Sequence, residues 1–215
     1  MIPFRYIAIE GPIGAGKTTL SHRLSQEFNA RLVLEEAEEN PFLPLFYENQ
    51  EAHAFQVQVF FLLSRYRQQK SILQQDLFQQ VTVSDYLFAK DKIFAELNLS
   101  EEEWELYQNL YKLLDAALPK PDLVIFLQAS HETLRKRIKK RGLDYEKSIS
   151  GNYIQDLSEA YNQFFFHYDE APVLTVNCTE MDILEQDLDY QFLLKEILAM
   201  ANNKLKKHYV SISSK

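Results

Sequence analysis

Short apolar runs alternate with longer stretches of helical periodicity along most of the chain. The apolar runs are typical of buried strands, and the stretches between them repeat apolar side chains every three to four residues. Strands that alternate with helices build a parallel sheet with helices on both of its faces. The pattern therefore predicts an α/β fold with a five-stranded parallel sheet, whose strands cover residues 6–10, 31–34, 81–85, 123–127 and 173–176.

The predicted helices have recognisable limits. A long helix is expected over residues 51–74, and Ser100 and Glu103 have the spacing of a capping box that opens another helix. Residues 130–141 form a basic helix that Gly142 can end, and further helices are expected over residues 153–167 and 189–206. Residues 208–215 are polar and are expected to form a frayed tail, so residues 1–207 are predicted to form a single domain.

The composition narrows the class of protein. The chain has 215 residues, of which 46% are apolar, and its net charge of −8 argues against nucleic acid or an anionic membrane as the main partner. No apolar run is long enough to span a bilayer, and the N-terminus lacks the pattern of a signal peptide, so a cytoplasmic location is expected. The single cysteine, Cys178, cannot form an intrachain disulfide, in keeping with a reducing compartment.

A glycine-rich motif between the first strand and its helix indicates the chemistry. Residues 11–18 spell G-P-I-G-A-G-K-T and fit the phosphate-binding P-loop. Glycine lets backbone N–H groups approach phosphates, Lys17 would reach the β- and γ-phosphates, and the Thr18 hydroxyl would ligate Mg²⁺. The residues expected to bind the nucleotide are Gly11, Pro12, Ile13, Gly14, Ala15, Gly16, Lys17, Thr18 and Thr19.

Acidic residues follow two of the predicted strands. Glu35 and Asp85 stand at carboxyl ends, where ligands bind in open α/β sheets. An acidic residue such as Asp85 can hold Mg²⁺ together with Thr18. Glu35 has no cation beside it in sequence and is suited to accept a proton from a neutral hydroxyl. Its neighbours Glu36, Glu38 and Glu39 are expected to form a solvated acidic loop.

Polar residues on the long helix suggest a place for a nucleobase. Gln58 and Arg65 are seven residues apart and project from nearly one face, next to the apolar stripe. A base recognised by the Gln58 amide and the Arg65 guanidinium would satisfy both side chains. The alternative is that they are two ordinary surface residues. Asp91 begins a short helix nearby in the predicted fold, and we expect it to pair with Arg65.

The basic helix concentrates cations in an otherwise acidic chain. Arg137 and Arg141 are four residues apart, so they share a face of the helix. We expect them to bind phosphate, as an arginine-rich lid over the P-loop, and the alternative is a solvated basic helix.

Taken together, these motifs resemble the bacterial deoxynucleoside kinases, and most closely the branch of deoxyguanosine and deoxyadenosine kinases. The resemblance extends from about residue 6 to residue 197. It is carried by the P-loop and by L-E-E-A with N-P-F-L at residues 34–43, Tyr47, Gln58 with L-S-R at residues 63–65, S-D-Y with K-D at residues 84–91, and R-I with R-G at residues 137–142.

The resemblance implies a role for each matching position. Glu35 matches the general base that activates the 5′-hydroxyl, and Lys17, Arg137 and Arg141 match the cations that act on the transferred phosphate. The positions that match substrate-binding residues are Glu35, Tyr47, Gln58, Arg65, Asp85, Asp91 and Glu146, of which Tyr47 and Glu146 would hold the sugar 3′-hydroxyl. The family also implies a homodimer that packs through helices.

Two positions depart from the family pattern. Tyr86 stands where many relatives have the arginine of a D-R-S motif, so one cation near the reacting oxygen is missing from its usual place. Leu143 stands where the lid usually offers a further arginine, and Arg135 or a nearby lysine is a candidate replacement.

The sequence thus predicts a kinase that moves the γ-phosphoryl group of ATP, with Mg²⁺, to the 5′-hydroxyl of a deoxynucleoside, with a purine preferred. Two alternatives remain. One is a nucleoside monophosphate kinase of the thymidylate kinase type, which would need cations at the acceptor end, where the sequence offers Glu35 and Tyr86. The other is a catalytically silent kinase-like subunit that binds nucleotide, against which intact Lys17, Thr18 and Glu35 argue.

Overall fold

One parallel sheet forms the centre of the molecule. The computed structural model describes residues 3–72, 81–115, 117–180 and 187–211. In these residues six parallel strands lie in the order β2-β3-β1-β4-β5-β6. The strands are β1 (Tyr6–Glu10), β2 (Arg31–Val33), β3 (Thr82–Ser84), β4 (Leu123–Gln128), β5 (Val173–Asn177) and β6 (Lys207–Ser211).

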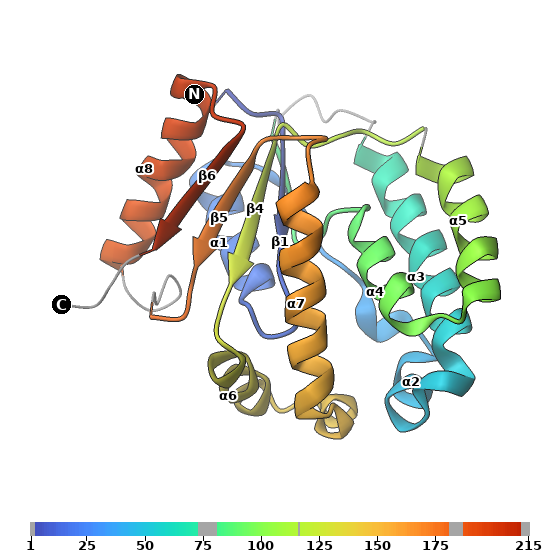
Figure 1. Cartoon of the computed structure of the whole chain (residues 1–215). Helices are drawn as coiled ribbons and strands as arrows, with labels where there is room; N and C mark the ends of the chain where they lie inside the picture. Colours follow the sequence, from blue (N-terminus) through green and yellow to red (C-terminus); the bar gives the residue numbers. More distant parts are fainter. Residues whose placement is uncertain (1–2, 73–80, 116, 181–186, 212–215) are drawn as a thin grey trace.

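Helices cover both faces of the sheet, as the sequence predicts. Side chains of β1 alternate between the faces, with Ile7 and Ile9 on one side and Tyr6 and Ala8 on the other. The first face packs against α1 (Lys17–Glu27) and α8 (Asp187–Asn203). The second packs against α3 (Gln50–Ile72), α4 (Lys90–Asn98) and α7 (Gly151–His167) (Figure 1). The central strands β1, β3 and β4 are therefore buried on both faces of the sheet, which explains why apolar residues dominate their sequences.

Helix α5 (Glu101–Asp115) lies outside this layer, against α3 and α4. Its predicted capping box is present, because the Glu103 N–H donates to Ser100 Oγ (3.3 Å) and the Ser100 N–H donates to Glu103 Oε2 (3.1 Å). Tyr107 and Tyr111 face inward, whereas Leu106 and Leu113 on the same helix are exposed. The helix is thus anchored through one aromatic face.

Short elements gather beyond the carboxyl ends of the strands. They are η1 (Ala37–Glu39), α2 (Leu43–Glu48), α6 (His131–Arg141) and η2 (Asp144–Ser148) (Figure 1). The predicted C-terminal stop of the basic helix is present, because Gly142 caps α6 with φ +72°, a left-handed conformation that favours glycine. These elements enclose the space above the P-loop.

The number of strands differs from the prediction. The sequence analysis predicts five and expects a frayed tail from residue 208, but Lys207–Ser211 form β6 beside β5. The stretch has a single buried apolar side chain, Val210, with exposed neighbours, so its hydrophobic signal is weak. Its pairing depends on the free edge of β5, which the local sequence does not reveal.

The last two residues of the predicted helix 51–74 lie outside the described residues. Within the described residues, no helix combines the length and the apolarity needed to cross a bilayer.

A matched pair of threonine substitutions tests the sixth strand. Val210 is 5% exposed and contributes to the core, whereas its neighbour Tyr209 is 56% exposed. Because Val210→Thr buries a hydroxyl in an apolar site, we expect the free energy of unfolding to fall by about 1 to 3 kcal/mol. Tyr209→Thr keeps a good strand former and should change it by less than about 0.5 kcal/mol. Urea unfolding measures both, and equal effects of the two substitutions would indicate a frayed tail.

Candidate active site

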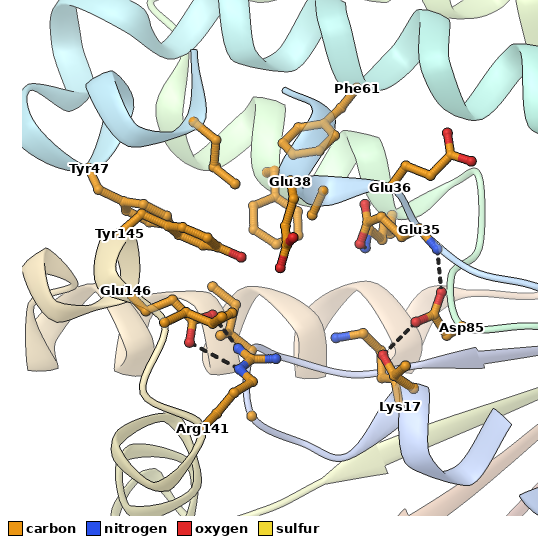
Figure 2. Close-up of a pocket in the computed structure, with 18 of the residues that line it drawn as sticks. Lys17, Glu35, Glu36, Glu38, Tyr47, Phe61, Asp85, Arg141, Tyr145 and Glu146 are labelled. Atoms are coloured by element: carbon orange, nitrogen blue, oxygen red, sulfur yellow. Dashed lines mark hydrogen bonds and ion pairs between the residues drawn. The ribbon is translucent and has the colours of Figure 1, made fainter. Parts of the chain in front are cut away.

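A large cavity opens at the carboxyl edge of the sheet, above the P-loop. Its volume is about 1010 Å³, which is enough for two ligands of nucleotide size or smaller. Among the described residues, its lining includes P-loop residues, Glu35, side chains of α2 and α3, Arg137, Lys140 and Arg141. Figure 2 shows Lys17, Glu35 and Asp85 on one side of this space and Tyr47, Tyr145 and Glu146 on the other. The cavity thus joins most of the predicted site residues.

The P-loop adopts a conformation that the sequence motif anticipates. Gly14 has φ +84°, and a Cβ there would stand 2.9 Å from the Leu134 carbonyl oxygen of α6, so no larger residue fits without a shift. Lys17 Nζ donates to the Gly11 carbonyl oxygen (2.8 Å) across the loop. Desolvation lowers the pKa of Lys17, and the nearby Lys90 ammonium lowers it further. The loop therefore offers a cation and backbone N–H groups at the floor of the cavity.

Asp85 connects the P-loop to the strand-end carboxylate. Its Oδ2 accepts a hydrogen bond from the Thr18 hydroxyl (2.6 Å), and its Oδ1 accepts one from the Glu35 N–H (2.7 Å). The two predicted metal ligands, Thr18 and Asp85, thus present oxygen atoms to the same point. Hard oxygen donors of this kind suit Mg²⁺, so the residues present fit the ion that the P-loop motif implies.

Glu35 lies between two cations. Its Oε1 accepts a hydrogen bond from Arg65 Nε (2.8 Å), and its Oε2 accepts one from Lys90 Nζ (2.7 Å). Burial favours the neutral carboxyl, but the charges of Arg65 and Lys90 outweigh it and hold the pKa of Glu35 well below its usual range. The carboxylate is therefore ionised and fixed in position at neutral pH.

The expectation that this end of the site lacks cations is wrong. The sequence analysis finds no cation next to Glu35 in the chain, yet α3 supplies Arg65 and α4 supplies Lys90. Both cations already contact the Glu35 carboxylate. The sequence analysis includes Lys90 in the K-D motif but gives it no role. The available signal was its position next to Asp91, close in sequence to the strand-end Asp85.

Arg65 also contacts the second predicted acidic partner. Its guanidinium forms an ion pair with Asp91, as the sequence analysis predicts, and stacks over the Phe61 ring at 4.6 Å from the ring centre. Asp91 is fully buried, so it acts on the cavity through Arg65. Gln58 is also buried and lines the cavity, and its Oε1 meets no hydrogen-bond donor among the residues that the structure describes. Gln58 and Arg65 are therefore buried, and the alternative that they are ordinary surface residues is wrong.

Aromatic and acidic side chains form the opposite wall. The Tyr47 and Tyr145 rings are stacked, with centres 6.2 Å apart and planes inclined by 6°. Burial raises the pKa of Tyr47, so its hydroxyl is neutral. Glu146 accepts a hydrogen bond from Arg141 Nε (3.0 Å), and burial nevertheless raises the pKa of Glu146. Glu146, predicted to bind the sugar 3′-hydroxyl, and Arg141, predicted to bind phosphate, thus bind each other.

The basic helix contributes three cations to the cavity. Arg137 lies closest to the P-loop, where its guanidinium donates to the carbonyl oxygens of Ala15 (3.3 Å) and Cys178 (3.0 Å). Lys140 and Arg141 also line the cavity. Of the two candidates to replace the arginine missing at Leu143, the described lining includes a lysine, Lys140, but not Arg135.

Two further acidic residues belong to this region. Glu10 ends β1 directly before the P-loop and is fully buried, and its carboxylate accepts hydrogen bonds from the N–H groups of Gly11 (2.9 Å) and Leu87 (2.8 Å). Glu38 is exposed, as expected, yet it lines the cavity and points into it (Figure 2). Glu10 therefore supports the loop, whereas Glu38 stands at the entrance.

Comparisons with known proteins show which proteins this chain is similar to. The model of the family described as "Deoxynucleoside kinase" matches residues 7–202. The chain is 41% identical over 191 residues to a deoxyguanosine kinase of Bacillus subtilis, covering 86% of this chain and 92% of that protein. It is 35% identical over 208 residues to a deoxyguanosine kinase of Lactobacillus johnsonii, covering 90% and 91%. A solved structure of deoxyadenosine kinase from M. mycoides with dCMP and dCDP bound is 27% identical, with a TM-score of 0.79, covering 90% of this chain and 99% of that one.

Removal of Arg65 tests the charge cluster. Arg65 has 5% of its side chain exposed and pairs with Glu35 and Asp91, so Arg65→Met leaves both carboxylates without this partner. We expect the free energy of unfolding at pH 7 to fall by about 3 to 5 kcal/mol. Since the pKa of Glu35 is lowered, its contribution exists above the ordinary value of 4.5 and is lost as the pH falls below it. Denaturant unfolding at pH 7 and below pH 4 should therefore show a smaller difference between parent and variant at low pH.

The control is Arg67→Met on the same helix, where the arginine is exposed. It should change stability by less than about 0.5 kcal/mol at either pH. A loss in Arg65→Met no larger than that of this control would contradict a stabilising role for the cluster.

Proposed function

Because this chain belongs to the deoxynucleoside kinase family and is an ATP-dependent kinase of deoxynucleosides, we propose that its acceptor is a purine deoxynucleoside, with deoxyguanosine preferred. The observation that carries the purine proposal is the buried Gln58 amide on the cavity wall. The amide can donate and accept, which suits the edge of a purine. The names of the two relatives at 41% and 35% identity favour deoxyguanosine.

The donor phosphates would bind at the P-loop. Backbone N–H groups at the start of α1 and the Lys17 ammonium would hold the β- and γ-phosphates. Thr18 and Asp85 would hold Mg²⁺ through the oxygen atoms that now share a hydrogen bond. The ion, when bound, neutralises charge on the phosphates. The chain's own part is to fix this end of the reaction next to Glu35.

The acceptor would lie between α3 and the wall formed by Tyr47 and Glu146. Gln58 and Arg65 would bind its base. The buried Asp91 would orient the Arg65 guanidinium through their ion pair. Tyr47 and Glu146 would hold the 3′-hydroxyl, because both line the cavity on the side away from the base. This orientation directs the 5′-hydroxyl towards Glu35 and the P-loop.

Glu35 would receive the proton of the 5′-hydroxyl. Its lowered pKa makes it a weak base, but phosphoryl transfer is dominated by positioning and charge neutralisation. A carboxylate held by two cations offers a fixed acceptor for the proton as the new P–O bond forms. Arg137 and Arg141 would neutralise the charge that develops on the transferred group, and Arg141 would leave Glu146 or bridge it to the phosphate to do so.

The assembly that performs this reaction is a further part of the proposal. We propose that the sheet, with β6 included, and its helices act as one domain and that two copies form a homodimer through α3 and α5. Leu63 on α3 and Leu106 and Leu113 on α5 are 47%, 52% and 77% exposed. Apolar side chains so exposed on neighbouring helices favour a partner surface. Sedimentation velocity that shows only monomer at micromolar concentration would contradict the dimer.

A substrate panel tests the activity and its base preference. Each of the four deoxynucleosides and the four corresponding monophosphates is incubated with ATP and Mg²⁺, and ADP release is measured. We expect deoxyguanosine to give the highest kcat/KM, deoxyadenosine to follow, and the monophosphates to give none. Turnover of a monophosphate alone would support a nucleoside monophosphate kinase, and no turnover of any substrate would support a silent subunit.

Glu35→Gln tests the proton acceptor. Glutamine keeps the shape and the hydrogen-bonding reach of glutamate but cannot take up a proton. We expect kcat to fall by about 10² to 10⁴, with the KM values for ATP and deoxynucleoside within a modest factor of the parent. Steady-state kinetics with each substrate varied in turn measures the effects on kcat and on the two KM values separately.

Glu36→Gln is the internal control for this substitution. Glu36 is adjacent in sequence, is exposed, and its side chain points away from Lys17 and Asp85 (Figure 2). It should retain most of the activity. Equal losses in the two variants, or inactivity of Glu36→Gln alone, would show that the proton acceptor is placed wrongly.

A further inference from the structure

Lys90 occupies an unusual position for a lysine. Its side chain is 3% exposed, yet it lines the cavity, and its ammonium donates to Glu35 Oε2 (2.7 Å). Glu10, which precedes the P-loop, lies 4.0 Å from the same ammonium. Lysine is almost never buried unless it is paired. The fold has therefore brought a compact cation between the start of the P-loop and the carboxylate at the acceptor end.

Tyr86, four residues before Lys90, is the position at which a cation is missing. The resemblance to the family implies an arginine at the position of Tyr86, and the side chain of Tyr86 is fully buried. Among the described residues that line the cavity, Lys90 is present and Tyr86 is not. The cation that the position of Tyr86 lacks is thus supplied by Lys90, the first residue of α4.

The backbone around Lys90 is held against the P-loop. The N–H of Leu87 donates to Glu10 Oε1 (2.8 Å), and the N–H of Gly11 donates to Glu10 Oε2 (2.9 Å). Glu10 therefore couples the turn before α4 to the first residue of the P-loop. Because Lys90 begins α4, these hydrogen bonds fix its position relative to both the P-loop and Glu35.

We propose that Lys90 is the positioning cation of the acceptor end, which holds the Glu35 carboxylate towards the 5′-hydroxyl in place of the family's arginine. The inference rests on the proposed function. Arg65 holds Glu35 Oε1 and Lys90 holds Oε2, so the plane of the carboxylate is defined from two sides. Without Lys90, Oε2 of Glu35 loses the hydrogen bond that this ammonium donates, and the carboxylate gains freedom to turn away from the acceptor.

A lysine in a buried ion pair can also serve stability alone, and the two roles predict different kinetics. A merely structural role would lower the amount of folded protein and leave the turnover of the folded fraction unchanged. A positioning role lowers kcat, leaves the KM values close to the parent, and depends on Glu35. The test therefore needs kinetics on folded protein and a second background in which Glu35 cannot act as the acceptor.

The experiment compares Lys90→Met with a matched control, Lys92→Met. Lys92 is on the same helix, but its ammonium lies 4.3 Å from the centre of the Tyr111 ring, and the described lining of the cavity does not include it. We expect Lys90→Met to lower kcat by about 10² with ATP and deoxyguanosine, at KM values within about threefold. Lys92→Met should keep kcat within about twofold of the parent. Tm values and active-site titration with ATP normalise the rates to folded protein.

The same lysine substitution is then made in Glu35→Gln. If Lys90 acts through Glu35, its loss in that background should lower kcat by less than about threefold, because the two effects are not additive. The double variant removes both charges together, so it leaves no unpaired Glu35 carboxylate. If Lys90→Met does not fold, Lys90→Gln, which keeps a donor for Glu35 without the charge, takes its place in the same cycle.

The outcomes separate this inference from the proposed function. If the parent does not phosphorylate any deoxynucleoside, the proposed function fails. If the parent is active but the lysine variant matches it in kcat, or loses the same factor with Glu35 and with Gln at position 35, the inference about Lys90 is overturned.

Discussion

A buried row of alternating charges decides the geometry of this active site. Asp91, Arg65, Glu35 and Lys90 contact one another in that order, and each of the four side chains is at most 16% exposed. Such a row is costly to desolvate, and its members stabilise one another only while all are present. The row joins the end of β2 to α3 and α4, so the packing of these helices and the position of Glu35 are set together.

The second constraint is the hydrogen-bonding of the P-loop to its neighbours in the sheet. Asp85 at the end of β3 binds both Thr18 and the backbone of Glu35, and Glu10 at the end of β1 binds both Gly11 and Leu87. In a parallel sheet the carboxyl ends of neighbouring strands lie at one edge. Two carboxylates at that edge therefore hold the phosphate loop and the acceptor end at a defined separation, which in-line transfer requires.

The other side of the cavity is built differently. There Arg141 pairs with Glu146, although its side chain is 45% exposed, and Tyr47 stacks on Tyr145. An exposed arginine can exchange one anionic partner for another at small cost, because water solvates it during the exchange. In the proposed function, the side formed by the buried charge row would carry the reacting groups, whereas Arg141, on the side formed by α6 and η2, would change partners when phosphate binds.

The sequence by itself determined the features that depend on local chemistry. Apolar runs and helical periodicity indicated the parallel α/β fold and five of the six strands, and the spacing of three glycines with Lys17 and Thr18 indicated the P-loop. The strand-end position of Glu35 and Asp85 followed from the same pattern, since the end of a strand is a property of consecutive residues. The pairing of Arg65 with Asp91 was also expected, because the elements that carry these opposite charges were predicted to border the same pocket.

Only the tertiary structure decided where the partners of these residues come from. Lys90 reaches Glu35 from 55 residues away, Arg141 pairs with Glu146 rather than standing free for phosphate, and β6 exists because β5 offers it an edge. Each of these partners is set by how the segments pack in three dimensions, which the residues of one segment alone do not specify. A charge can be counted from the sequence, but the carboxylate that it meets is chosen by the packing of whole helices against the sheet.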